Sequence, residues 1–272
     1  MENIFVSRLV LPQVTLCAAT SVNVAATLRA LEASLDKVEF AECKLFTDAP
    51  VKADHPGITV VHIGPLCSTE AYSDFVLSHM VDHIETSHCL ISQWDGHVLN
   101  AQRWRPEFLE YDYIGARWPQ FADGHDVGNG GFSLRSRRLM EACREPGFNA
   151  SHVEDIAIGR TNRKWLEDMG LCFAPPQLAD VFATERAGDL KKSFGYHGVW
   201  HMPRAIGVRA FWQMYRDLDN KGTVRADFVT ILKEVGNGAG GAQRVTQMIF
   251  DYMIGGFGRP AVPHPPKTCE KA

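Results

Sequence analysis

Asp95 is the residue whose position most strongly suggests chemistry. It follows the apolar run His88-Cys89-Leu90-Ile91-Ser92-Gln93, which predicts a buried strand, and it precedes Gly96. A lone Asp at a strand end is also a common turn former. Mg²⁺ and Mn²⁺ prefer oxygen ligands and bridge phosphates, so one or two protein ligands can suffice. The bulky Trp94 beside Asp95 favours a phosphate-bound metal site at Gln93-Trp94-Asp95-Gly96 over a plain turn.

Three later segments carry residue types suited to catalysis. Gly128-Asn129-Gly130-Gly131 allows close approach to a ligand, although such loops more often only turn a chain, and no Lys follows to make a phosphate loop. Glu154 and Asp155 open a predicted helix, where carboxylates also offset the helix dipole. One of them is a candidate general base for a hydroxyl group. His197 sits between glycines and aromatic residues, where a packing role is the more common alternative to metal binding.

Alternating strands and helices must position these groups. Strands are expected at 13–20, 44–48, 59–63 and 88–93, with helices at 23–37 and 70–85. This order predicts a mainly parallel sheet with helices on both faces. Ligands of such sheets bind beyond the carboxyl ends of the strands. Those ends carry Thr20, Ser21, Asp48 and the segment from Gln93 to Asp95.

The rest of the chain predicts smaller elements and then a change of character. The expected elements are a strand at 113–115, a strand at 132–135 leading into a helix at 136–144, a helix at 153–166, strand and loop at 171–182, and helices at 207–218, 224–235 and 242–254. We therefore predict a catalytic domain over 1–205, a helical extension over 206–254, and a flexible tail over 255–272.

Composition narrows the class of protein. The chain has 272 residues, 45% hydrophobic and 22% charged, with a net charge of -4. This is ordinary globular composition without the basic surface that nucleic acid requires. Seven cysteines without a Cys-x-x-Cys pair indicate free thiols in a reducing compartment. The start resembles no signal peptide, and no apolar run is long enough to span a membrane. We expect a cytoplasmic protein, and contact with the inner face of the membrane stays compatible with the sequence.

The order of the motifs resembles the core of GT-A glycosyltransferases. Gly130-Gly131-Phe132-Ser133-Leu134-Arg135 followed by Glu154-Asp155-Ile156 is similar to the pattern of β-1,3-galactosyltransferase-like enzymes. The chain resembles more closely a bacterial, glycosyltransferase-like family of unknown function, over roughly residues 10–200. Gln93-Trp94-Asp95-Gly96, Val127 to Arg135, and Phe194-Gly195-Tyr196-His197-Gly198 carry that resemblance. Gln93 departs from the usual acidic motif of GT-A glycosyltransferases, Asp-x-Asp, which has a carboxylate at that position.

The resemblance implies a GT-A fold and a metal-dependent transfer from a nucleotide diphosphate sugar, UDP-sugars favoured, to a glycan or glycolipid hydroxyl. It implies polysaccharide biosynthesis and a hexosyltransferase-like, inverting enzyme. Asp155, or less readily Glu154, would be the base, and Asp95 and His197 would hold Mn²⁺ or Mg²⁺. The donor would meet Thr20, Ser21, Asp48, Ser73, Gln93, Trp94 and Asp95, and the sugars would meet Asn129, Gly130, Gly131 and Trp118.

Rival interpretations stay open at this point. A retaining transferase on the same fold would need no base at Asp155. A sugar nucleotidyltransferase would want a basic, Gly-rich loop after the first strand, which Ala18-Ala19-Thr20-Ser21 does not provide. A catalytically silent carbohydrate-binding or scaffolding module would explain Gln93. The helices beyond 206 could form a homodimer, bind another partner or cover the acceptor.

Overall fold

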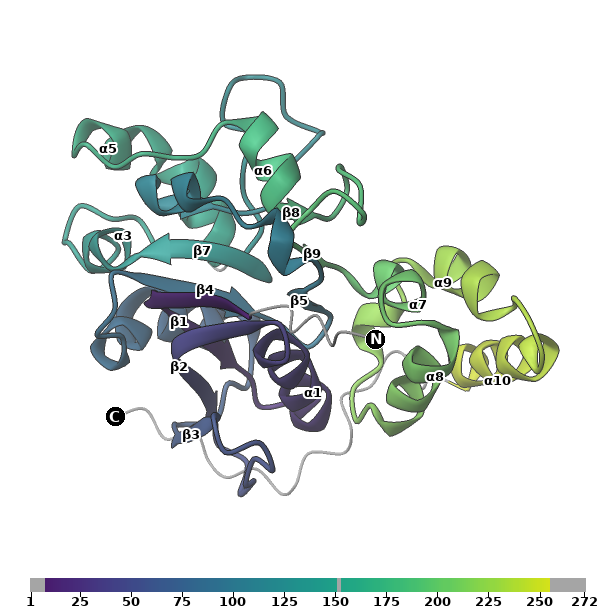
Figure 1. Cartoon of the computed structure of the whole chain (residues 1–272). Helices are drawn as coiled ribbons and strands as arrows, with labels where there is room; N and C mark the ends of the chain where they lie inside the picture. Colours follow the sequence, from purple (N-terminus) through teal and green to yellow (C-terminus); the bar gives the residue numbers. More distant parts are fainter. Residues whose placement is uncertain (1–7, 151–152, 255–272) are drawn as a thin grey trace, which may run out of the picture. The chain divides into compact units, whose positions relative to one another are not determined.

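A six-stranded sheet forms the centre of the first of two compact units, which meet in sequence at Gly198 and Val199 (Figure 1). The computed structural model describes residues 8–150 and 153–254. The strands, in spatial order, are β3 (Thr59–His62), β2 (Val38–Thr47), β1 (Leu9–Ala19), β4 (His88–Ser92), β7 (Phe132–Ser136) and β6 (Tyr113–Ile114). Strands β1 to β4 run parallel, and β7 is antiparallel to both of its neighbours. The predicted α/β class, a mainly parallel mixed sheet, is confirmed.

Alternating side chains of the sheet build a core on each of its faces. In β1, Leu16 and Ala18 belong to one apolar cluster, while Cys17 and Ala19 belong to another. The helices are α1 (Val24–Leu35), α2 (Thr69–Asp74), α3 (Arg137–Ala142), α4 (Glu154–Ile156), α5 (Arg163–Asp168) and α6 (Pro176–Phe182). Helices α1 and α6 contribute to the first cluster. The π-helical turn Phe75–His79 and the 3-10 turn Met80–His83, which continue α2, contribute to the second.

A small second sheet connects segments that are far apart in the sequence. It consists of β5 (Gly96–Val98), β9 (Gly195–His197) and β8 (Ala183–Thr184), in that order. Strand β5 is antiparallel to β9, and Gly96 lies opposite His197. Because β5 follows β4 after a short turn, this pairing brings His197 to the carboxyl end of β4.

Several parts of the first unit differ from the sequence prediction, among them the short strands β5, β8 and β9, which were not expected. Residues 171–182 were expected as strand and loop, but α6 begins at Pro176. Proline fits the first turn of a helix, where its missing N–H would have no partner. The helix expected at 153–166 is divided into α4, a π-helical turn at Ala157–Thr161 and α5. Short 3-10 turns at Ala101–Arg103 and Pro106–Glu110 precede β6.

The described part of the second unit consists of helices joined by short turns. It contains 3-10 turns at Val199–His201 and Gly222–Val224 and the helices α7 (Met202–Ala205), α8 (Val208–Asp217), α9 (Phe228–Val235) and α10 (Gly241–Met253). Phe211, Ile231 and Met248 are fully buried and bring α8, α9 and α10 into its core. Across both units, the described helices include none with the length and apolar character needed to cross a bilayer. The tail predicted at 255–272 lies outside the described residues.

Candidate active site

A tight turn at the carboxyl end of β4 buries Asp95. The Ser92 hydroxyl donates a 2.6 Å hydrogen bond to the carbonyl of Gly96, and the Gly96 N–H donates to the carbonyl of Gln93 at 3.1 Å. A Cβ at Gly96 would lie 2.6 Å from the carbonyl oxygen of Tyr196, so only glycine fits this turn. Asp95 is left 6% exposed.

The second sheet places His197 against this carboxylate. Its Nε2 lies 3.4 Å from Oδ1 of Asp95, and the Gly198 N–H donates to the Asp95 carbonyl at 3.1 Å. Apart from this ion pair, Oδ1 of Asp95 is buried without a hydrogen bond among the residues that the structure describes. A buried carboxylate oxygen left in this way has capacity for a further ligand.

His197 is surrounded by polar groups from three other segments. Its Nδ1 lies 3.0 Å from Nδ2 of Asn129 and 3.3 Å from Oε1 of Glu185, and its Nε2 lies 3.3 Å from Oε1 of Gln93. Burial lowers the pKa of His197, but the carboxylates of Asp95 and Glu185 outweigh it and raise the pKa to about 10. Burial raises the pKa of Glu185, and His197 reverses this, so that its pKa ends below the usual value. The cluster therefore contains two carboxylates around one imidazolium.

The loop Asn129-Gly130-Gly131 holds this cluster from the other side. Asn129 has a φ of 76°, and its side-chain oxygen accepts hydrogen bonds from the N–H groups of Gly131 at 2.8 Å and Phe132 at 3.1 Å. The Gly131 carbonyl accepts from the N–H of Gln93 at 2.8 Å. These bonds fix the loop to the turn that carries Asp95.

Replacing Gly131 by alanine should destabilise the protein by about 1–3 kcal/mol, because the added methyl overpacks the site. Its Cβ would lie 2.1 Å from Nε2 of His197. The matched control is Gly64→Ala, where an added Cβ meets open space. Urea denaturation of both variants measures the difference. Equal stabilities would show that His197 does not occupy the position described.

The same loop reaches a second pair of carboxylates. The Gly130 N–H donates to Oδ2 of Asp155 at 3.2 Å. Burial, and then the neighbouring charge of Glu154, raise the pKa of Asp155 to about 6. Oε1 of Glu154 lies 3.2 Å from Nη2 of Arg135, which is 1% exposed. Glu154 is thus committed to a buried ion pair, whereas Asp155 has a carboxyl group whose pKa lies within reach of neutral pH.

Tyr72 and Glu185 join the site although neither lies in a motif that could be recognised in the sequence. The Tyr72 hydroxyl accepts a 3.2 Å hydrogen bond from Nε2 of Gln93, and burial and the charge of Glu154 raise its pKa. Tyr72 lies in an ordinary helical pattern, and Glu185 follows the two-residue strand β8 outside any motif. These two residues reach the site only because segments that are far apart in the sequence lie side by side in the fold.

The other predicted donor residues lie at neighbouring strand ends. Thr20 and Asp48 follow β1 and β2, which run parallel to β4, so they share its carboxyl edge. The Ser21 hydroxyl accepts a hydrogen bond from the N–H of Leu66 at 2.7 Å, and Ser73 is buried in α2. The side chains of Thr20 and Ser21 bond to the N–H groups of Val22 and Leu66, at 3.1 and 2.7 Å, and not to Asp95.

Both predicted tryptophans are largely buried. Trp94 is 8% and Trp118 is 6% exposed. The Trp118 ring fills the space beside Gly128, where an added Cβ would lie 2.1 Å from it, and packs edge-on against Phe121. This packing supports the loop that carries Asn129.

A divalent cation fits these residues if substrate phosphates supply most of its ligands. Within residues 8–150 and 153–254, no three His, Cys, Asp or Glu side chains are arranged to hold a metal by themselves. Asp95 and His197 offer two donors, and Oδ1 of Asp95 has spare capacity. Mg²⁺ sites commonly combine one or two protein ligands with phosphates. Binding through His197 would displace the proton that the carboxylates stabilise.

Comparisons with known proteins identify one family whose model matches this chain and two solved structures that are distantly similar to it. The family described as "Protein of unknown function (DUF5672)" matches residues 58–197, more than half of the chain and the part that holds the whole cluster. No curated protein matches.

Two solved structures are similar at low identity. A mannosyltransferase, PcManGT from Pyrobaculum calidifontis in complex with GDP-Man and Mn²⁺, is 13% identical with a TM-score of 0.40, covering 92% of this chain and 77% of that one. A glycosyltransferase involved in glycosylation of the major capsid of PBCV-1 is 11% identical with a TM-score of 0.42, covering 68% and 91%.

Proposed function

Because the chain belongs to the DUF5672 family, whose name assigns no activity, we propose from its site that it is a glycosyltransferase with a nucleotide diphosphate sugar as donor. One observation carries the proposal. The loop Asn129-Gly130-Gly131 joins a buried His197–Asp95 pair to a carboxylate, Asp155, whose pKa is about 6. The two halves suit the two needs of the reaction, which are stabilising a leaving diphosphate and deprotonating an acceptor hydroxyl.

The Asp95 side of the loop would receive the donor diphosphate. The two negative charges of Asp95 and Glu185 exceed the single positive charge of His197. These carboxylates would therefore repel a diphosphate unless a cation lay between the carboxylates and the phosphates. Mn²⁺ or Mg²⁺ held by Asp95 and His197 would neutralise the charge of the leaving group. Gln93 would contribute its amide oxygen, which lies beside His197, in place of a second carboxylate. Thr20, Ser21, Asp48 and Ser73, with Trp94 behind the turn, would line the nucleoside end.

The Asp155 side would receive the acceptor. Asn129, Gly130 and Gly131 would contact the sugars, with Trp118 packed beneath the loop. Asp155 would take the proton from the acceptor hydroxyl as that oxygen attacks the anomeric carbon, so the configuration there would invert. Oδ2 of Asp155 would keep its orientation through the Gly130 N–H. A glycan or glycolipid hydroxyl is the acceptor class we propose.

The rate of transfer should rise with pH up to about 6 and then level off. The raised pKa of Asp155 means that its carboxyl is protonated, and unable to act as a base, below that value. Each pH unit below 6 should cost about tenfold in kcat/KM. A profile that stays flat down to about pH 4, the ordinary pKa of an aspartate, would contradict the assignment of Asp155 as base.

A thermal-shift screen of nucleotide sugars, with and without Mn²⁺, tests donor binding. A ligand at a hundredfold excess over its dissociation constant stabilises a protein by about 2.7 kcal/mol. We expect at least one nucleotide sugar to raise the melting temperature, and to do so more strongly with Mn²⁺. Stabilisation that is equal with and without Mn²⁺ would leave donor binding in place and remove the metal from the proposal. No stabilisation by any donor would count against the proposal itself.

A further inference from the structure

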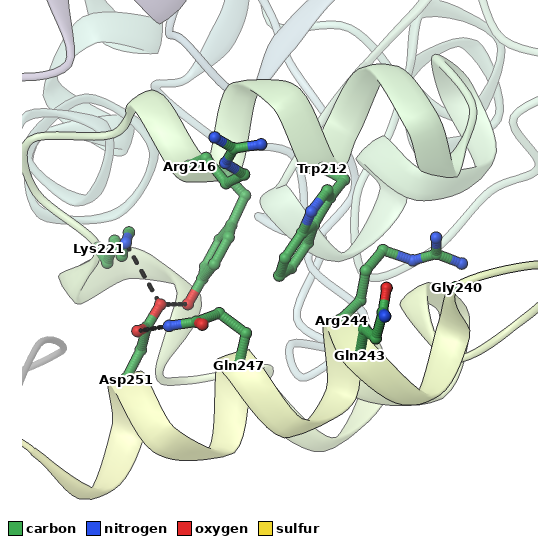
Figure 2. Close-up of a pocket in the computed structure, with 9 residues that line it drawn as sticks. Trp212, Arg216, Lys221, Gly240, Gln243, Arg244, Gln247 and Asp251 are labelled. Carbon is green, nitrogen blue, oxygen red and sulfur yellow. Dashed lines mark hydrogen bonds and ion pairs between the residues drawn. The ribbon is translucent and has the colours of Figure 1, made fainter.

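The helical second unit holds a cavity of about 660 Å³, wholly within residues 199–254 (Figure 2). It lies between α8 and α10, and its lining side chains are separate from those around Asp95. Its volume falls in the range of roughly 300–1,000 Å³ that is typical of small-ligand sites. The lining is mostly polar and includes a tryptophan and three basic side chains.

Asp251 fixes one end of the cavity. This residue is 9% exposed and accepts hydrogen bonds from the Tyr215 hydroxyl at 2.7 Å, from Nε2 of Gln247 at 2.7 Å, and from Nζ of Lys221 at 3.3 Å. Three segments of the unit are thereby tied to one carboxylate. The negative charge of Asp251 is balanced by the ion pair with Lys221.

Trp212 provides an aromatic wall. One face of its ring stacks on Tyr215, with centroids 5.1 Å apart and 19° between the planes. Figure 2 shows Trp212 reaching from the upper helix into the space above Gln243 and Gln247 of α10. A partly exposed aromatic ring beside amide groups suits a sugar, whose C–H face stacks on the ring while its hydroxyls bond to the amides.

The remaining charge of the lining is positive. With Lys221 paired to Asp251, the guanidinium groups of Arg216 and Arg244 have no carboxylate partner in the lining. Arg244 is held by the carbonyls of Val235, Asn237 and Ala239 at 2.7–2.9 Å, which fixes its position and leaves further N–H groups available. A planar guanidinium held in this way matches a carboxylate or phosphate group.

We propose that this cavity binds an anionic saccharide unit, such as a uronic acid residue within a glycan. Its ring stacks on Trp212, its hydroxyls contact Gln243 and Gln247, and its acidic group binds Arg244, while Arg216 adds positive charge on the other side of Trp212. The preference for an anion follows from the charges of the lining. The choice of a saccharide rests in part on the proposed function.

Titration of the ¹⁵N-labelled full-length chain with trigalacturonic acid tests the proposal. The indole N–H resonance of Trp212, assigned with the Trp212→Phe variant, is the readout. We expect it to shift saturably with trigalacturonic acid, and neutral maltotriose to bind about tenfold more weakly. Arg216→Gln should weaken trigalacturonate binding about tenfold, whereas Arg209→Gln, on the same helix but outside the lining, should leave it unchanged.

Three results would overturn the proposal. They are an unmoved Trp212 resonance, equal affinity for maltotriose and trigalacturonic acid, and equal or tighter binding of inorganic phosphate or UDP at Trp212. The outcome is separable from that of the transfer reaction. Saturable binding at Trp212 in a protein that consumes no nucleotide sugar would support this site and contradict the proposed function. Consumption of nucleotide sugar by a protein that shows no binding at Trp212 would support the proposed function and contradict this site.

Discussion

The Asp155→Asn variant should lose about 10²–10⁴-fold in kcat, because it can no longer accept a proton from the acceptor hydroxyl. Asparagine has nearly the same shape, and its side-chain oxygen can still accept the hydrogen bond from the Gly130 N–H. Donor binding should therefore persist, as measured by the thermal shift with nucleotide sugar. Product formation under saturating donor gives the rate. Near wild-type transfer would show that Asp155 is not the base.

The pH dependence of folding stability provides an independent check on the raised pKa of Asp155. The pKa of Asp155 is about 6 in the folded protein, above its ordinary value of 3.8, so the folded state binds the proton more tightly than the unfolded state does. The resulting stability is fully present below pH 3.8 and is lost as the pH rises through 6. Asparagine does not titrate, so the variant should gain stability relative to wild type between pH 4 and 7. A constant difference across that window would show that the Asp155 pKa is not raised.

The Glu154→Gln variant should lose about 3–5 kcal/mol of folding free energy, because it leaves the guanidinium of Arg135 buried without its partner. Arg135 is 1% and Glu154 is 5% exposed, and their ion pair measures 3.2 Å. Urea denaturation at pH 7 measures the loss.

An exposed ion pair serves as the matched control for Glu154. Glu141→Gln breaks the Arg137–Glu141 pair on α3 and should cost less than about 1 kcal/mol. The comparison also separates the two carboxylates at the start of α4. If Glu154→Gln stayed stable and lost transfer instead, Glu154 rather than Asp155 would be the base.

Local pattern was sufficient to predict the main-sheet strands that lead to Asp95, but not the strands β5, β8 and β9 of the second sheet. The apolar runs at 44–48, 59–63 and 88–93 are all strands, and Asp95 follows the last of them at the edge where parallel strands end. The Pro176 segment was misread because two adjacent prolines suggest a loop, although a proline in the first turn costs a helix nothing.

Long-range pairing set the limit on predicting the site. Gly96 and His197 are opposite each other only because β5 pairs with β9, and no spacing in the sequence encodes that register. The same pairing, together with β8, brings Glu185 within 3.3 Å of His197. The difference between Glu154, which forms a buried ion pair, and Asp155, which does not share it, could not be predicted from the sequence either. It depends on which of the two carboxylates Arg135 contacts in the folded protein.

The central claim is tested most directly by nucleoside diphosphate release from a panel of nucleotide sugars in Mn²⁺. The full chain should release product from at least one donor. Asp95→Ala, Asp155→Asn and a chelator should each abolish release, whereas Asp54→Ala, at an exposed position outside the site, should not. No release from any donor, or release that is unchanged in both site variants, would contradict a glycosyltransferase built on Asp95 and Asp155.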